Sequence, residues 1–304
     1  MVTLVRAPNP SPMTLSGTNS YVIDCGKNEA LVIDPGPPIP AHVDAIVGAA
    51  RERGLTITAI AVTHGHPDHA PAAAPLAAQT GALVYAHPAG KIVRDRDLPL
   101  DAPLHVGATA LDVLDAPGHT FDHVVFYLAQ ERALFTGDVI LGEGTVVIAP
   151  PHGAMRPYQR TLERLAREFP DARTIYGGHG PAVADARAKI AEYIEHRRVR
   201  ERELLDALAA GGSQTIPQLV PRIYGTAHAE LYPAMARQLL AYLIALEAEG
   251  RVVATRLDRA MTPAESETLN PDLERLVGPD QAAVIAAELG AAMRVTDLYE
   301  YALV

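Results

Sequence analysis

Apolar runs divide the first two thirds of the chain into short strands separated by helices. Runs rich in β-branched and aromatic residues predict strands, and longer stretches rich in Ala and Leu predict helices. The expected strands are residues 2–5, 20–24, 30–33, 56–62, 83–86, 110–114, 124–128, 133–135, 146–148 and 174–176; the expected helices are 41–53, 70–79, 158–168 and 182–210. Residues 91–105, rich in Asp and Pro, predict a long loop. This order is typical of an α/β fold in which two mixed sheets are sandwiched between helices.

The pattern changes after Gly211 and Gly212, which break the long helical stretch. A short helix at 216–223, a longer one at 230–249 and a strand at 251–255 favour a small winged-helix-like unit. Residues 261–304 add helical segments punctuated by prolines. The predicted parts are therefore an α/β domain at 1–205, a winged-helix-like domain at 206–257 and a helical C-terminal extension at 258–304. A lid and a contact in a homodimer are the two roles open to the extension.

Composition narrows the class of protein. Hydrophobic residues make up 48% of the 304 residues, which is enough for a sizeable core. No apolar run is long enough to span a membrane, and the N-terminus shows no basic start followed by an apolar stretch. Cys25 is the single cysteine, so an internal disulfide framework is excluded and a cytoplasmic location is expected. A formal net charge of −10 disfavours general affinity for nucleic acids but leaves room for a local basic groove.

Candidate chemistry is densest at Thr63-His64-Gly65-His66-Pro67-Asp68-His69, between the strand at 56–62 and the helix at 70–79. His64, His66 and His69 offer imidazole nitrogens, and Asp68 offers a carboxylate oxygen. Such ligands suit zinc, and the mixture of nitrogen and oxygen also suits iron or manganese. The intervening Gly and Pro favour a tight turn on which these side chains converge. The stretch therefore predicts a metal site.

Three more ligand-type residues each stand just beyond a predicted strand. His119 follows the strand at 110–114, Asp138 follows 133–135, and His179 follows 174–176. Each has a neighbouring Gly, which permits close backbone approach in a crowded centre. Together with the first motif they predict one metal-binding constellation.

This constellation resembles the binuclear site of the metallo-β-lactamase superfamily. Asp34, in Val32-Ile33-Asp34-Pro35-Gly36, also matches an early Asp-x-Gly element of that family. The stretches Gly17-Thr18-Asn19-Ser20-Tyr21, Gly118-His119-Thr120-Phe121-Asp122-His123 and Phe135 to Gly142 look closest to the branch of the beta-lactamase-like endoribonuclease and related bacterial hydrolases. The resemblance implies an αββα sandwich with its site along one sheet edge, and it implies the C-terminal winged-helix-like unit.

The resemblance also implies ligand assignments for two zinc ions per chain. One ion would be held by His64, His66 and His119, and the other by Asp68, His69 and His179, with Asp138 bridging them. Two metals about 3.5–4 Å apart can share a water and lower its pKa toward neutrality. The hydroxide would attack a carbonyl or phosphorus. Asp68 would also act in catalysis by orienting the nucleophile and relaying a proton.

Two residues near this set each have two alternative roles. Asp34 either fixes the tautomer of a ligand histidine or serves as a turn residue at a strand end. His123, four residues after His119, either reaches the cleft as a catalytic group that stabilises developing charge or is a structural histidine. His152 is more simply an exposed loop histidine.

Three functions remain at the level of sequence. The first is a metal-dependent hydrolase of a small-molecule ester, thioester, lactone or lactam. The second is an endoribonuclease that cuts single-stranded RNA, and the third is a non-catalytic metal-binding scaffold whose winged-helix-like unit recruits a partner. The complete ligand set argues against the scaffold, and no Ser-x-x-Lys, Gly-x-Ser-x-Gly or Walker-type motif occurs. We favour the small-molecule hydrolase.

Overall fold

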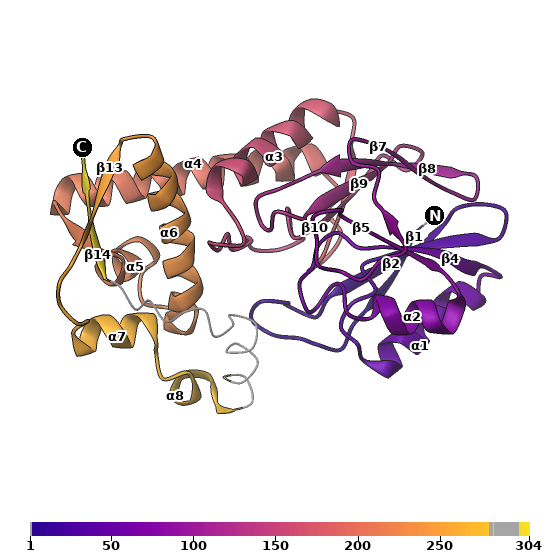
Figure 1. The fold of residues 1–304 in the computed structure, drawn as a ribbon, viewed down its shortest axis with the longest axis horizontal. Coiled ribbons are helices and arrows are strands. Elements are labelled where there is room, and N and C mark those ends of the chain that lie inside the picture. Colours follow the sequence, from indigo (N-terminus) through magenta and orange to yellow (C-terminus); the bar gives the residue numbers. More distant parts are fainter. Residues whose placement is uncertain (1, 280–281, 283–297) are drawn as a thin grey trace. The chain divides into compact units, whose positions relative to one another are not determined.

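The computed structural model describes residues 2–279, 282 and 298–304 (Figure 1). Two compact units divide the chain. Unit 1 contains Met1–Val146 and Arg160–Tyr193, and unit 2 contains Val147–Gln159 and Ile194–Val304. Each unit has its own sheet structure and is described by itself below.

The first sheet of unit 1 carries the earliest strands of the chain. It contains β1 (Val2–Arg6), β2 (Asn19–Asp24), β3 (Glu29–Ile33), β4 (Thr56–Ala61), β5 (Leu83–Ala86) and β6 (Arg96–Asp97), hydrogen-bonded in that order. The pairs β1–β2 and β2–β3 are antiparallel, whereas β3, β4, β5 and β6 run parallel to one another. Parallel strands are usually covered on both faces, which explains the continuous apolar runs of β3 and β4.

Strict alternation in β2 and β3 divides their side chains between two cores. Tyr21 and Ile23 face the second sheet of unit 1, while Val22 lies in the cluster formed with two helices. These helices are α1 (Pro40–Arg51) and α2 (Ala73–Thr80), which contribute Ile46 and Leu76. The first sheet therefore has helices on one face and another sheet on the other.

The second sheet of unit 1 is made by later strands in the order β11-β10-β9-β8-β7. Their bounds are β7 (Ala102–Val106), β8 (Thr109–Asp115), β9 (Val124–Leu128), β10 (Ala133–Gly137) and β11 (Thr174–Gly177). Only β10 and β11 pair in parallel among them. Leu111, Phe126 and Phe135 join Tyr21 and Ile23 in the core between the sheets.

Helix α3 spans Met155–Glu168, and its part from Arg160 onward belongs to unit 1 and covers the second sheet. Arg164 Nη1 donates to the carbonyl of Asp115 at 3.0 Å, and the ring of Phe169 lies 4.5 Å from that of Tyr127. Unit 1 is thus helix, sheet, sheet, helix, which confirms the predicted αββα class.

Parallel pairing sets the position of the candidate site. The carboxyl ends of β3 and β4 carry Asp34 and the His64 motif, and the carboxyl ends of β10 and β11 carry Asp138 and His179. In α/β proteins the carboxyl ends of parallel strands are the usual place for a ligand site. Here both sheets contribute such ends.

Unit 2 is built from helices and a small antiparallel sheet. It contains the later part of α4 (Ala186–Gly211), α5 (Ile216–Tyr224), the short helix η1 (Ala229–Leu231), α6 (Tyr232–Ala248), α7 (Pro263–Leu269) and α8 (Leu273–Val277). Its sheet has the order β12-β14-β13, with bounds Gln214–Thr215, Tyr299–Leu303 and Val252–Arg256. α6 buries residues on most sides, including Leu239, Tyr242 and Leu243.

Guanidinium groups meet carboxylates or rings throughout unit 2. Arg156 is hydrogen-bonded to both Glu201 and Glu249, and Arg251 Nη1 donates to Glu201 Oε1 at 2.8 Å. Arg197, 1% exposed, places its guanidinium carbon 5.0 Å from the centre of the Tyr158 ring. The carboxylates balance the charges of Arg156 and Arg251, and the Tyr158 ring gives Arg197 a cation–π contact.

Several expectations from the sequence need correction. The predicted loop at 91–105 contains β6 and most of β7, because Leu104 and Val106 alternate into the inter-sheet core. Residues 146–148 form no strand.

The C-terminal extension also differs from its prediction. β14 lies within the predicted extension 258–304, yet it is the central strand of the unit 2 sheet. The compact units divide after Tyr193, and the predicted domain bounds at 205 and 257 stay predictions. The helices predicted across 280–281 and 283–297 lie outside the described residues.

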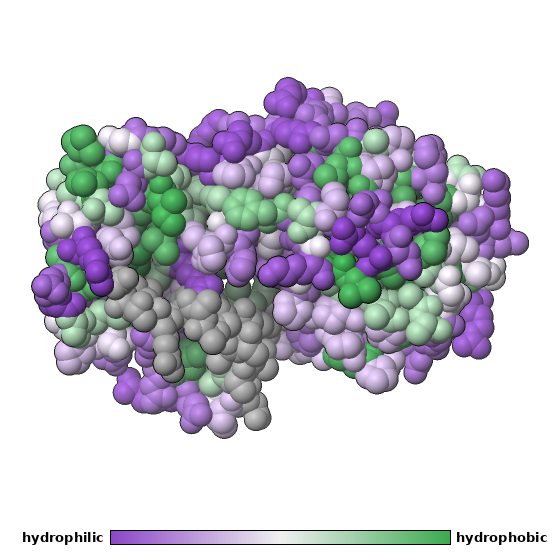
Figure 2. Space-filling model, viewed as in Figure 1, coloured by the Kyte–Doolittle hydropathy of each residue, from purple (hydrophilic) through white to green (hydrophobic). Residues whose placement is uncertain are grey.

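The outer surface adds two observations. Within the described ranges, no helix combines the length and the apolar character that crossing a bilayer requires. Apolar residues gather over β13 and β14 (Figure 2), where Val253 is 47% exposed and Leu303 is 40% exposed. The two roles left open for the extension, a lid and a contact in a homodimer, stay predictions.

Candidate metal centre

Seven ligand-type side chains from distant parts of unit 1 converge at the edge shared by its two sheets. They fall into two groups, each with donor atoms within 4.8 Å of one another: His64, His66, His119 and Asp138; and Asp68, His69 and His179. These are the seven metal ligands expected from the sequence. The structure brings all of them together.

The second group forms a nearly equilateral triangle of donor atoms. Asp68 Oδ2 lies 3.3 Å from His69 Nε2 and 3.2 Å from His179 Nε2, and the two nitrogens are 3.4 Å apart. Tetrahedral zinc with bonds of 2.0–2.1 Å would separate its ligand atoms by about 3.3–3.4 Å. The triangle therefore fits one face of a tetrahedral ion.

The first group is richer in imidazole. His66 Nδ1 and His119 Nε2 lie 3.1 Å apart. His64 is fully buried, and its Nε2 has no hydrogen-bond partner among the described residues. A buried nitrogen left without a partner is costly, so such an atom in a cluster of ligand-type side chains fits the binding of a cation.

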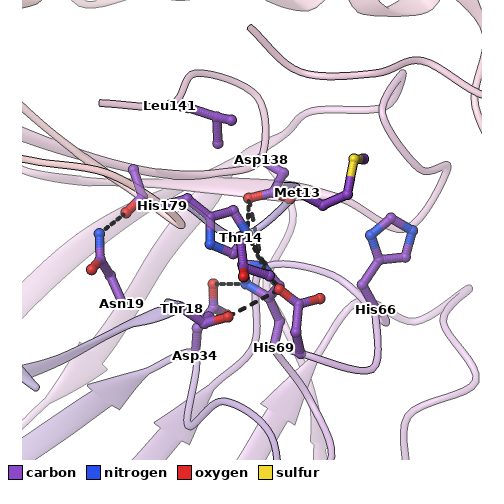
Figure 3. A network of polar contacts seen from close by, with 12 residues as sticks. Met13, Thr14, Thr18, Asn19, Asp34, His66, His69, Asp138, Leu141 and His179 are labelled. Atoms are coloured by element: carbon purple, nitrogen blue, oxygen red, sulfur yellow. Dashed lines mark hydrogen bonds and ion pairs between the residues drawn. The ribbon is translucent and has the colours of Figure 1, made fainter. Parts of the chain in front are cut away.

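Asp138 lies between the groups (Figure 3). Its Oδ1 is 3.4 Å from His69 Nε2 and 3.5 Å from His179 Nε2, while its Oδ2 is 3.7 Å from His119 Nε2. One carboxylate oxygen therefore faces each group.

Asp34 orients one histidine of each group. Its Oδ2 accepts hydrogen bonds from His69 Nδ1 at 2.9 Å and from the Thr63 hydroxyl at 2.7 Å. Because the Thr63 proton goes to Asp34, the Thr63 oxygen accepts from His64 Nδ1 at 3.0 Å. Both histidines then carry their proton on Nδ1 and turn a bare Nε2 toward the centre. The geometry matches the first of the two readings of Asp34.

Electrostatics differ between the groups. Burial lowers the pKa of His64 well below its ordinary value and that of His66 to about 4, so both are neutral ligands at pH 7. Burial would also lower the pKa of His179, but Asp138 and Asp68 raise it to about 9. Burial would raise the pKa of Asp68, but His69 and His179 hold it well below its usual range. The second group therefore attracts positive charge.

Glycines make room for this crowding. A Cβ at Gly178 would overlap Asp138 Oδ1 and His69 Cε1. Gly137, at a φ of +46°, would place a Cβ against Thr63 and 2.9 Å from His123 Cε1. Glycine at these positions lets β10 and β11 deliver their ligands at close range.

His123 lies behind the ligands. It is fully buried, and its ring stacks on that of His64 with 4.6 Å between the ring centres. Its Nε2 accepts a hydrogen bond from the Asp138 backbone N–H at 3.1 Å. A ring so enclosed does not touch a substrate, so the geometry favours the structural reading over the catalytic one expected for His123. Its contact with Asp138 makes it a support for that ligand.

Polar neighbours outside the motifs also contribute. The hydroxyls of Thr18 and Thr63 each contact a carboxylate of the site, at Asp68 and Asp34 respectively. In the sequence, Thr18 stands out only as part of the stretch that resembles the endoribonuclease branch, and Thr63 carries no sign of a role. The one signal for either was adjacency to motif residues.

The donor set as a whole fits metal ions. Imidazole nitrogens and carboxylate oxygens converge, and the opposite ring nitrogens of His64 and His69 are held by Thr63 and Asp34 respectively. Such outer hydrogen bonds are the usual mark of metal-ligating histidines. The cluster can hold metal ions.

Comparison with known proteins gives the same answer by another route. The family model described as the metallo-beta-lactamase superfamily matches residues 13–179, and the beta-lactamase associated winged helix domain matches residues 215–259. The chain is 34% identical over 234 residues to a beta-lactamase-like protein 2 homolog of Caenorhabditis elegans, covering 73% of this chain and 76% of the relative. It is 33% identical over 233 residues to an atrochrysone carboxyl ACP thioesterase of Aspergillus chevalieri, covering 74% of this chain and 73% of the relative.

A solved structure is similar across most of the chain. The crystal structure of a metallo-beta-lactamase family protein from Thermus thermophilus superposes with a TM-score of 0.69 at 25% identity, covering 84% of this chain and 95% of that chain. The winged-helix unit predicted from the sequence is thereby confirmed together with the catalytic fold.

Proposed function

The chain belongs to the metallo-beta-lactamase superfamily, and we propose that it is a hydrolase that uses two zinc ions to cleave a small acyl thioester or ester. The proposal rests on one observation above the rest, the Asp138 carboxylate with one oxygen toward each donor group. A carboxylate so placed is suited to bridge two cations.

Each group would hold one ion. His64, His66 and His119 would hold the first, and Asp68, His69 and His179 the second, with Asp138 common to both. When bound, the ions would lower the pKa of a water molecule toward neutrality and polarise the carbonyl of the substrate. Zinc is the first choice because the second triangle matches tetrahedral ligand spacing, and iron or manganese also suit mixed nitrogen and oxygen donors.

Asp68 is the residue of the site best placed to handle a proton. Its side chain is 24% exposed, more than those of Asp138, His69 and His179. Its low pKa keeps it anionic, so it can accept a hydrogen bond from a water molecule and orient it. Asp68 would then accept the proton released by this water molecule and pass it to the leaving thiolate or alkoxide.

The thioester is the substrate we would test first. Two relatives at 33% and 30% identity are named atrochrysone carboxyl ACP thioesterases. Esters, lactones and lactams share the same polarised carbonyl and belong to the same reaction class.

RNA is a weaker candidate. In unit 2, Arg156, Arg251 and Arg259 each meet a carboxylate, so these three cations are already engaged and less able to bind phosphates. The net charge of −10 also opposes binding of a polyanion.

Parallel assays would test the proposal. The zinc-loaded protein is given an S-acyl cysteamine thioester, a p-nitrophenyl ester and a single-stranded RNA oligonucleotide, with the metal-free protein as control. We expect saturable, metal-dependent turnover of the thioester and ester. Metal-dependent cleavage of the RNA with no turnover of either acyl substrate would contradict the proposal and favour the nuclease. Two tightly bound ions without turnover of any of the three would favour the scaffold.

A further inference from the structure

The segment Gly17–Asn19, which leads into β2, is clamped to the turn that carries His179. The Asn19 backbone N–H donates to the Gly178 carbonyl at 2.8 Å. The Asn19 side-chain amide donates to the carbonyls of Gly177 at 3.0 Å and Gly180 at 2.9 Å (Figure 3 shows Asn19 beside His179). These bonds fix the chain on both sides of a ligand of the second group.

Gly17 acts on the ring of that ligand. Its carbonyl lies 3.4 Å from His179 Nδ1. A carbonyl only accepts, so the contact favours the proton on Nδ1 and leaves Nε2 bare toward Asp68.

Thr18 acts on the carboxylate of the second group. It is fully buried, and its hydroxyl contacts Asn9 Nδ2 and Asp68 Oδ2, both at 3.0 Å. The orientation of the Asn9 amide is set because its Oδ1 accepts the Thr18 backbone N–H at 2.9 Å. Asn9 Nδ2 can only donate, so the Thr18 proton must go to Asp68.

The hydrogen bond from the Thr18 hydroxyl orients the Asp68 carboxylate. Oδ2 is the oxygen that completes the triangle with His69 and His179. A carboxylate oxygen has two lone-pair directions, and Thr18 occupies one of them. The other is left for a cation.

We propose that Gly17–Asn19 is the positioning element of the second metal group and sets its affinity separately from that of the first. The inference rests on the proposed function, since it requires a second ion. The first group is oriented elsewhere, through Thr63 and His64. Thr18 is a positioning residue, because it acts through Asp68.

Zinc titration of the metal-free protein tests this directly. Competition with a chromophoric chelator resolves the dissociation constants of the two equivalents. In Thr18→Val we expect one of the two equivalents to bind about 10–100-fold more weakly, the usual effect of losing an outer hydrogen bond to a ligand, with the other unchanged. Thr18→Ser keeps the hydroxyl and should bind both equivalents as the wild type does.

Thr58→Val is the matched control. The Thr58 hydroxyl donates to Glu29 Oε2 at 3.0 Å, so the same substitution removes the same kind of bond. Thr58 lies in β4 toward the end opposite His64. Both equivalents should bind as in the wild type.

The outcomes separate the two proposals. Two ions in the wild type with unchanged binding in Thr18→Val would overturn the inference and leave the proposed function standing. A wild type that takes up a single ion would overturn both. Equal weakening of both equivalents would overturn the inference, because Thr18 would then act on the fold. Thermal unfolding of the metal-free variants checks folding, and Thr18→Ala, which adds no bulk, decides by the same criteria if the valine variant does not fold.

Discussion

Carboxylates at the sheet edge of unit 1 and carboxylates in unit 2 face different partners. Asp68 and Asp138 lie among imidazoles, whose charge depends on protonation. Glu201 and Glu249 meet the permanently charged guanidinium of Arg156. The charges of this unit 2 cluster, Arg156 and Arg251 with Glu201 and Glu249, are thus balanced within the fold, whereas the unit 1 edge depends on protons or on a cation. Function is therefore expected at the unit 1 edge, because its charges are not balanced within the chain and are available to a ligand.

Removing metal should have the largest effect, and on unit 1. A chelator that strips the ions should abolish turnover. If free zinc exceeds the dissociation constant of a site about 1,000-fold, the loss of each ion costs about 4 kcal/mol, or roughly 10 °C in the unfolding temperature of a unit of this size. Scanning calorimetry with and without chelator measures the shift. Equal unfolding temperatures with and without chelator would show that the unit 1 edge does not depend on a bound cation for stability.

Asp138→Ala should come next. It removes the carboxylate that faces both groups, so we expect a loss of activity on the order of 10²–10³-fold, as for loss of one preorganised charge-stabilising group. Metal content should fall from two ions to about one, and the fold should survive. Metal analysis and initial rates check this. Two ions and wild-type rates would exclude a bridging role.

Arg156→Met tests the other side of the comparison. It leaves Glu249 and Glu201 facing only Arg251, so unit 2 should lose about 1–3 kcal/mol of stability, within the range for a partly buried pair. Metal content should stay at the wild-type value. Denaturant unfolding followed by metal analysis measures both. A loss of bound metal would show that the two sets of charges are coupled.

Glu265→Gln should give the smallest effect. Arg259 and then Thr262 outweigh burial and lower the pKa of Glu265 to about 2, from an ordinary value of 4.5. The Glu265–Arg259 pair therefore makes its full contribution to the free energy of unfolding above about pH 4.5. That contribution is lost as pH falls through about 2. We expect a cost of about 0.2–1 kcal/mol at pH 7 that disappears in acid. Unfolding curves at pH 7 and near pH 2 would show it, and a pH-independent cost would contradict the charge explanation.

The ligands were predictable from the sequence because their signals are local. His64, His66, Asp68 and His69 sit within six positions, and His119, Asp138 and His179 each stand near a Gly just beyond a strand. The supporting hydroxyls were not predictable in the same way. Thr18 meets Asp68 across 50 positions, and a lone Thr carries no mark of such a contact.

Strand pairing explains the remaining differences in the fold. β14 joins the unit 2 sheet only through partners far away in the chain. β7 lies in a stretch whose Pro and Asp content masks a short alternation at Leu104 and Val106. In both cases tertiary burial decided what local propensity did not.

The order of the ligands along the chain has a consequence for synthesis. The first group is complete once Asp138 has left the ribosome, whereas the second group waits for His179, 41 residues later (179 − 138). His179 arrives with β11, the strand that closes the edge of the second sheet beside β10. Chains grow at about 5–20 residues per second, so several seconds separate the two events. A nascent chain thus passes through an interval in which an ion can meet one finished group of ligands while the other is still unmade.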